Sequence, residues 1–181
     1  MTRLKRKMDA QLVITAPAPH AEALAYATRC RSTIGVLVQL VAEAEKHIAI
    51  AAPFIQSELF ESGAFNDAVR SALDREVAIS LLSTKDTLAR KEIKQLIDRF
   101  GPALTVYFPA FPEFETSQLG SHAKFCISDD SGAYIGSANL TTPGLTKHFE
   151  LGVLVRGQAA KQMKSFWDFA VRFELFRVID I

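Results

Sequence analysis

The stretch HAKFCISDDSGAYIGSAN, residues 122–139, has the pattern of two short strands joined by a turn. Residues 129–132, DDSG, are turn-forming, and the segments on either side of them are rich in apolar residues. Side chains alternate between the two faces of a strand, so His122 and Lys124 point to one side and Phe125 points to the other. The pattern predicts an antiparallel hairpin with polar groups gathered on one face.

The positions of the polar residues on the second strand follow from the turn. If the turn occupies 129–132, residue 128 faces residue 133, and each step away from the turn adds one opposed pair. Asn139 then lies across from His122, and Ser137 lies across from Lys124. Opposed residues of an antiparallel pair share a face, so the four polar side chains are expected on one surface.

Three further residues complete this prediction. Gly136 directly precedes Ser137 on the second strand, where a missing side chain leaves room for a ligand to approach the backbone. Asp129 has the wrong parity for the polar face, so we expect it to hold the hairpin together. Glu150 lies in the strand that follows and points away from the apolar residues of that strand, where its carboxylate could accept a hydrogen bond from an imidazole.

The remainder of the chain alternates between helical and strand patterns. Helices are expected over 31–47, 65–76 and 84–100 and at the C-terminal end, where Ala159, Met163, Phe166, Trp167, Ala170 and Phe173 form one apolar face. Strands are expected over 47–55, 77–83, 104–108 and 148–155. This order predicts an α/β domain with a mixed sheet covered by helices on both faces. Residues 1–30 are expected to form a weakly structured arm, and 31–181 a single catalytic domain.

Composition sets limits on the function. The chain has 181 residues, of which 49% are hydrophobic and 23% charged, and its formal net charge is +1. A nucleic-acid or membrane partner therefore needs a local basic face. The two cysteines, Cys30 and Cys126, form no CxxC pair, and no apolar run is long enough for a transmembrane helix. A cytoplasmic location is expected.

The polar cluster suits an anion. Lys124 supplies a positive charge, Ser137 and Asn139 supply hydrogen-bond donors to phosphate oxygens, and His122 can attack phosphorus or protonate a leaving oxygen. A metal site built from His122, His148 and Glu150 is conceivable by ligand type, but the ammonium of the neighbouring lysine would repel a cation.

The spacing His122-x-Lys124-x4-Asp129-x6-Gly136-Ser137-x-Asn139 resembles the HKD signature of the phospholipase D superfamily. The resemblance covers about residues 32–181 and implies a PLD-like α/β/α sandwich. It further implies a phosphohistidine on His122, phosphate binding by Lys124, Ser137 and Asn139, orientation of His122 by Glu150, a structural Asp129, and no metal or cofactor. His148 departs from the family pattern, which leaves its role open between a residue that supports the site and a surface residue.

Chemistry through a phosphohistidine needs a second histidine to protonate the leaving group. Neither His20 nor His47 has a lysine two residues later, so the chain has one motif. A two-fold homodimer with one His122 from each chain meets the requirement, and small single-motif endonucleases of the superfamily resemble this arrangement. The sequence therefore predicts a metal-independent phosphodiesterase that cleaves nucleic acid.

Other interpretations stay open. A phospholipid phosphodiesterase or phosphatidyltransferase is the second enzymatic one, although small size and the lack of a membrane anchor point away from the lipid-handling relatives. No stable membrane association is expected. A non-catalytic subunit that binds nucleic acid or partner proteins is the third. The segment 136–155 also resembles the PLD-like subunit of DISARM-type phage-defence systems, which implies partner proteins. Phe111 and Phe114 could stack on a base or pack in their loop. The basic side chains of the helix over 84–100 are expected to form a solvated face or to touch a nucleic-acid backbone; they are Arg90, Lys91, Lys94 and Arg99.

Overall fold

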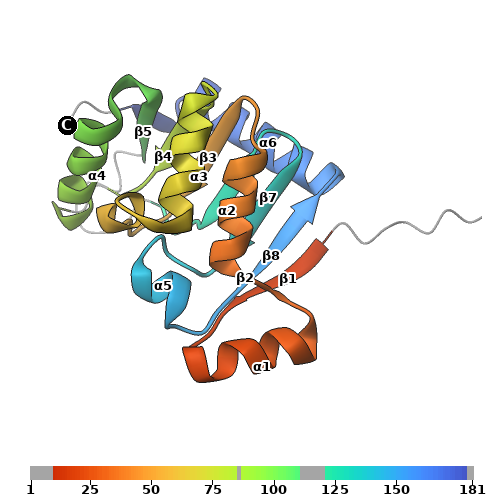
Figure 1. Ribbon diagram of the computed structural model, residues 1–181. Coiled ribbons are helices and arrows are strands. Elements are labelled where there is room, and N and C mark those ends of the chain that lie inside the picture. The colour runs from red at the N-terminus through yellow and green to blue at the C-terminus, as the bar shows by residue number, and fades with distance from the viewer. Residues whose placement is uncertain (1–9, 85–86, 111–120, 179–181) are drawn as a thin grey trace, which may run out of the picture.

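The computed structural model describes residues 10–84, 87–110 and 121–178, with side chains placed outside 85–90. In these residues the chain forms one sheet of 9 strands in the order β2-β1-β8-β7-β6-β3-β4-β5-β9 (Figure 1). The strands are β1 Ala10–Thr15, β2 Arg31–Ser32, β3 His47–Ala51, β4 Ala78–Leu82, β5 Leu104–Pro109, β6 Phe125–Ser128, β7 Gly132–Gly136, β8 Glu150–Arg156 and β9 Phe176–Val178.

The sheet is mixed. The strands β3, β4 and β5 are parallel neighbours, and each is joined to the next by a crossover that contains a helix. The strands β6, β7, β8 and β1 run antiparallel to one another, and β6 pairs antiparallel with β3. The helices are α1 Ala18–Thr28, α2 Thr33–Glu43, α3 Gly63–Asp74, α4 Thr87–Phe100, α5 Thr142–Thr146 and α6 Gln158–Arg172, with short 3-10 turns at Ser57–Phe60 and Gly101–Ala103.

Helices cover both faces of the sheet, which confirms the predicted fold class. Figure 1 shows α2 and α3 side by side on one face, and their apolar residues join those of α4 in the larger core cluster. On the other face, Trp167 of α6 packs against β3, β4, β6 and β7 in a second cluster. Burial of this apolar surface on both sides of the sheet is the main favourable contribution to folding.

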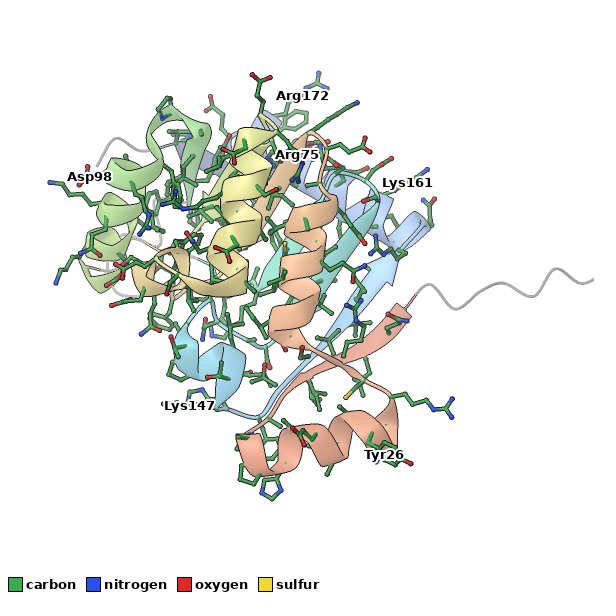
Figure 2. The ribbon with its side chains drawn as sticks, viewed as in Figure 1. Tyr26, Arg75, Asp98, Lys147, Lys161 and Arg172 are labelled. Atoms are coloured by element: carbon green, nitrogen blue, oxygen red, sulfur yellow. The ribbon has the colours of Figure 1, made fainter. Side chains whose placement is uncertain are left out.

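Hydrogen bonds from side chains mark where α2 begins and ends. The side chain of Ser32 accepts a hydrogen bond from Gly35 N at 3.2 Å and caps α2. At the other end of this helix, Arg75 donates to the carbonyls of Ala42 and Ala44, each at 3.1 Å. A cation beside the free carbonyls of a helix C-terminus is favourable. Figure 2 shows the Arg75 side chain at the end of α2 and α3.

The prediction of a weakly structured arm over residues 1–30 is wrong for residues 10–28. Residues Ala10–Thr15 form β1, which lies between β2 and β8, and Ala18–Thr28 form α1. Of the two prolines of TAPAPH, Pro17 separates the two elements and Pro19 lies in the first turn of α1, and neither disrupts them. Pro17 stands before the first turn of α1, where a missing backbone NH costs nothing. The strand pairs with β8, far away in sequence, so local composition gave no signal for it.

The C-terminal helix differs in part from its predicted apolar face. Trp167 and Ala170 are buried, as expected, but Ala159 and Phe173 are exposed and Phe166 is half exposed. Lys91, Lys94 and Arg99 of α4 are exposed, whereas the side chain of Arg90 and the residues Phe111 and Phe114 lie outside the described part of the chain. Within residues 10–84, 87–110 and 121–178, no helix is both long and apolar enough to cross a membrane.

Candidate active site

The polar residues singled out from the sequence meet at one edge of the sheet. His122 and Lys124 directly precede β6, Ser137 and Asn139 directly follow β7, and Glu150 begins β8. Because these three strands are antiparallel neighbours, the start of β6, the end of β7 and the start of β8 lie at the same edge. The site therefore consists of strand ends supported by a buried sheet.

The register of the hairpin is one residue away from the prediction. Ser128 pairs with Gly132, so the turn has three residues and not four. Asp129 takes a positive φ of 47°, a conformation that Asp tolerates better than most residues, and it permits the tighter turn. As a result, Lys124 lies opposite Gly136, whose backbone NH donates to Lys124 O at 3.1 Å. Ser137 is not directly across from Lys124.

Lys124 is nearly buried, with 7% of its surface exposed. Its ammonium Nζ lies 3.3 Å from His122 Nδ1 and donates to His122 O at 3.1 Å, while the His122 side chain is exposed. Burial lowers the pKa of Lys124, and the nearby Glu150 carboxylate opposes this shift. A cation is thus held beside the imidazole at the rim of the sheet.

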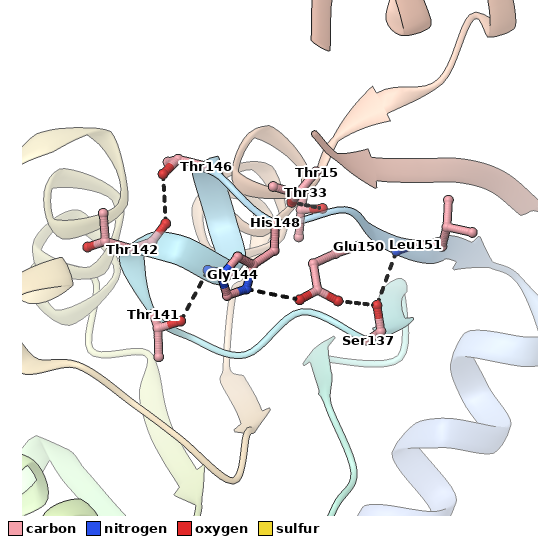
Figure 3. A network of polar contacts seen from close by, with 10 residues as sticks. All are labelled: Thr15, Thr33, Ser137, Thr141, Thr142, Gly144, Thr146, His148, Glu150 and Leu151. Carbon is pink, nitrogen blue, oxygen red and sulfur yellow. Dashed lines mark hydrogen bonds and ion pairs between the residues drawn. The ribbon is translucent and has the colours of Figure 1, made fainter. Parts of the chain in front are cut away.

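Glu150 and Ser137 form the second half of the site. Ser137 Oγ donates to Glu150 Oε2 and accepts from Leu151 N at 3.1 Å (Figure 3). The other carboxylate oxygen of Glu150 lies 3.8 Å from Nδ1 of His148, which is itself mostly exposed. In the described residues, the contacts of Glu150 are thus with Ser137 and His148, and its expected contact with His122 is not formed.

Asn139 has an unsatisfied polar atom. Its Oδ1 is buried and has no hydrogen-bond partner among the described residues. A buried polar atom without a partner costs about 1–3 kcal/mol, and a bound ligand can recover that cost. Rotation of the amide by half a turn exchanges its oxygen and nitrogen, so the same position can present a donor to an anion.

Gly136 does not leave the predicted room for a ligand. The ring of Tyr134 lies over it, and a Cβ at Gly136 would stand 2.1 Å from Tyr134 Oη. Gly152 on the neighbouring strand serves the same purpose, since a Cβ there would stand 2.3 Å from Tyr134 Cε2. The two glycines face each other across β7 and β8 and make space for a buried tyrosine.

Asp129 makes its contacts at the opposite end of β6. Its carboxylate accepts from the backbone NH groups of Glu45 at 2.8 Å, Lys46 at 3.2 Å and His47 at 2.8 Å. These contacts join the hairpin turn to the loop before β3, which is a structural role and one that extends beyond the hairpin. In the described residues there is no group of three or more His, Cys, Asp and Glu side chains arranged to hold a metal ion.

One residue at this edge was missed by reasoning from sequence. Phe54 follows β3 and is 40% exposed, and its carbonyl accepts from Leu140 N, the neighbour of Asn139. In the sequence it looks like one more member of the apolar run 48–55. The Pro-Phe step at the end of a buried strand is the local signal that could have marked it as a loop residue.

The fold and these strand ends together define a protein of the phospholipase D type. The family model described as cardiolipin synthase, PLD-like domain, matches residues 37–169, which is most of the chain. The chain belongs to this family. The comparison with curated protein sequences gives no match.

Solved structures show the same fold. Nuc from Salmonella typhimurium, a phospholipase D family member, is 16% identical with a TM-score of 0.65, and the match covers 95% of this chain and 98% of that one. NucT from Helicobacter pylori is 14% identical with a TM-score of 0.66, with coverage of 94% and 99%. The phosphatidylserine synthase of Haemophilus influenzae Rd KW20 is 12% identical with a TM-score of 0.67, and the match covers 98% of this chain but 41% of the synthase.

Proposed function

We propose that this protein is a metal-independent phosphodiesterase that cleaves nucleic acid through a phosphohistidine on His122, with the active site completed by a second copy of the chain. The observation that carries the proposal is the placement of the Lys124 ammonium 3.3 Å from His122 Nδ1, at the edge where Ser137, Asn139 and Glu150 also lie. A nucleophile beside a fixed cation and hydrogen-bond donors is what attack on a phosphodiester requires.

The contact between Lys124 and His122 suggests how substrate prepares the nucleophile. An ammonium has no lone pair, so Nδ1 of His122 accepts in this contact and the neutral ring carries its proton on Nε2. A substrate phosphate would draw the ammonium of Lys124 onto its oxygens and release Nδ1. The proton could then move to Nδ1, which leaves a lone pair on Nε2 for attack. Orientation of the ring by Glu150 stays a prediction, because the contacts of Glu150 in the structure are with Ser137 and His148.

The reaction then needs two steps. Nε2 of His122 forms a bond to phosphorus as the bond to the leaving oxygen breaks, and the leaving oxygen takes a proton from His122 of the second copy. A water molecule next attacks phosphorus, gives its proton to the second imidazole, and displaces the first. Lys124, Ser137 and Asn139 would bind the phosphate oxygens as charge builds on them.

An exposed apolar row supports a second copy as the partner. Leu12, Val153 and Ile135 are directly paired across β1, β8 and β7 and so share one sheet face. Each is exposed, and Leu151, which follows Glu150, is exposed by 63% on the same face. Apolar rows of this kind mark interaction surfaces. We propose that a second copy covers the row, which places the two active sites near one axis.

The deciding experiment is a nuclease assay with EDTA present, on labelled single- and double-stranded DNA and RNA. Wild type should cleave at least one of them, and His122→Ala should not, while both keep the same sedimentation coefficient. Mixing the two proteins tests the shared site. If each site needs both histidines, activity follows the square of the wild-type fraction, whereas independent sites give a linear decline. Full cleavage by His122→Ala would refute the mechanism.

A lipid substrate is the second candidate, because the family model is described as cardiolipin synthase and one similar structure is a phosphatidylserine synthase. It predicts turnover of phospholipid vesicles and none of the four nucleic acids. The chain matches 41% of that synthase but nearly the whole of Nuc and NucT, and this extent of structural match supports the first candidate. Absence of a covalent intermediate with any diester would favour a non-catalytic subunit.

The cellular location and the partner proteins are part of the same proposal. A cytoplasmic location is part of the proposal, and the two cysteines, Cys30 and Cys126, are compatible with it because neither is in a disulfide. A phage-defence complex would supply partner proteins that direct the nuclease and keep it from the host genome. Co-purification of the untagged chain from its native host would identify such partners.

A further inference from the structure

Phe54 is an exposed aromatic residue in an otherwise buried segment. Ala52, Pro53 and Ile55 are buried around it, whereas 40% of Phe54 is exposed. Its ring is therefore directed away from the core that its neighbours enter. The exposed part of the Phe54 ring leaves apolar surface in water, where it is available to a flat binding partner.

The backbone that carries Phe54 is held on both sides. Pro53 O accepts from Ser83 Oγ at 3.4 Å and from Thr84 Oγ1 at 3.2 Å. Phe54 O accepts from Leu140 N at 3.2 Å, and Leu140 O accepts from Gln56 N at 2.9 Å. An aromatic ring on a fixed backbone can bind a flat partner with little loss of conformational entropy.

Phe54 lies at the edge that carries the proposed nucleophile. In the antiparallel pair of β3 and β6, Ala51 is the partner of Phe125. From this pair the chain continues forward through 52–54 and backward through 124–122, so Phe54 and His122 leave the sheet at the same edge. On its other side Phe54 is hydrogen-bonded to the residue after Asn139. The backbone of Phe54 thus lies at the edge where a phosphate would bind, and its exposed side chain is available there.

We infer that Phe54 stacks on an unpaired base next to the scissile phosphate, and so directs the enzyme to single-stranded nucleic acid. The inference rests on the proposed function and names its substrate class. Bases of a duplex are already stacked and their faces are not available, whereas an unpaired base presents one to an aromatic ring. Stacking of this kind tolerates any base, so it distinguishes single-stranded from double-stranded nucleic acid but does not distinguish one sequence from another.

The test compares wild type with Phe54→Ala and Phe54→Trp in a nuclease assay with EDTA present. Three labelled substrates are used: a single strand, the same strand with tetrahydrofuran abasic residues on both sides of the cleaved bond, and the duplex. Phe54→Ala should raise KM on the normal single strand by about fivefold to 150-fold, the range for one stacked base, and should leave KM on the abasic strand unchanged. Phe54→Trp should keep the wild-type preference. Tyr26→Ala is the matched control, because Tyr26 is 90% exposed and projects from α1 (Figure 2).

Outcomes separate this inference from the proposed function. If wild type cleaves normal and abasic strands equally well, or Phe54→Ala loses the same factor on both, the stacking role is refuted while the nuclease stands. If wild type cleaves duplex better than single strand, the substrate class is wrong. If wild type cleaves no nucleic acid but turns over phosphatidylglycerol vesicles, the proposed function fails and the inference fails with it. Thermal unfolding of each variant shows that it is folded.

Discussion

Asp129 offers the sharpest test of how the hairpin is held. Its carboxylate accepts three backbone NH groups, from Glu45, Lys46 and His47, at 2.8 to 3.2 Å. Hydrogen bonds to a charged group contribute about 1.5–3 kcal/mol each when measured alone. The three share one carboxylate and two of them lie near the surface, so we expect their sum to be about 2–4 kcal/mol.

The choice of variant matters because Asp129 has a φ of 47°. Alanine would add backbone strain in this conformation, whereas Asp129→Gly removes the carboxylate and relaxes the backbone. Asp129→Asn is the matched control, since it tolerates the same φ and keeps one acceptor oxygen. We expect a loss of about 1 kcal/mol for Asn and about 2–4 kcal/mol for Gly.

Urea unfolding followed by Trp167 measures both losses. Trp167 is the single tryptophan of the chain, and it is buried between α6 and the sheet. With a slope of about 2 kcal/mol/M, the Gly variant should lower the midpoint by about 1–2 M. All proteins are compared at one concentration, because a dimer gains stability by mass action. A midpoint for Asp129→Gly within about 0.2 M of wild type would refute the structural role.

Three other residues give predictions of different kinds. Gly152→Ala should lower stability by about 1–3 kcal/mol, because its Cβ would meet the Tyr134 ring at 2.3 Å; thermal unfolding checks this, and no loss would contradict the packing. Burial lowers the pKa of Lys124 below 10.5, so kcat/KM should fall as the pH rises through that lowered pKa. Arginine stays charged at these pH values, so any activity that remains in Lys124→Arg should not show this alkaline decrease. If the variant shows the same decrease as wild type, another group causes it. Burial raises the pKa of Cys126 to about 12, so a thiol reagent should titrate Cys30 in the folded protein and both cysteines in denaturant; equal native rates would contradict the burial.

The sheet and its helices could be predicted because their signals are local. Apolar runs and helical periodicity gave β3, β4, β5 and β8 and the helices α3 and α4 within a few residues, but they gave no sign of the short helix α5. The strand β1 could not be found in this way, since it depends on pairing with β8 across more than a hundred residues. The register of the hairpin was predicted one residue off, because the turn length depends on the positive φ of Asp129 and not on composition.

In the candidate site too, some features could be predicted from local sequence and others depend on contacts between distant residues. Strand parity was enough to predict that Glu150 points away from Leu151 and Val153, and the pairing of β8 with β7 and β1 places those two on one face. Side-chain partners were beyond the sequence, since whether Glu150 binds His122 or Ser137 depends on distances of a few ångströms. The role of Gly136 was hidden for a similar reason, because the group that fills its space is the ring of Tyr134.

The most direct test of the central claim is to trap the covalent intermediate. Wild-type protein is mixed with a nucleic acid that the EDTA assay shows to be cleaved, quenched during turnover, digested and analysed by mass spectrometry for phosphorylated peptides. The proposed mechanism predicts an acid-labile nucleotide adduct on His122, absent from His122→Ala. An adduct on any other residue, or rapid cleavage with no adduct and full activity in His122→Ala, would contradict it.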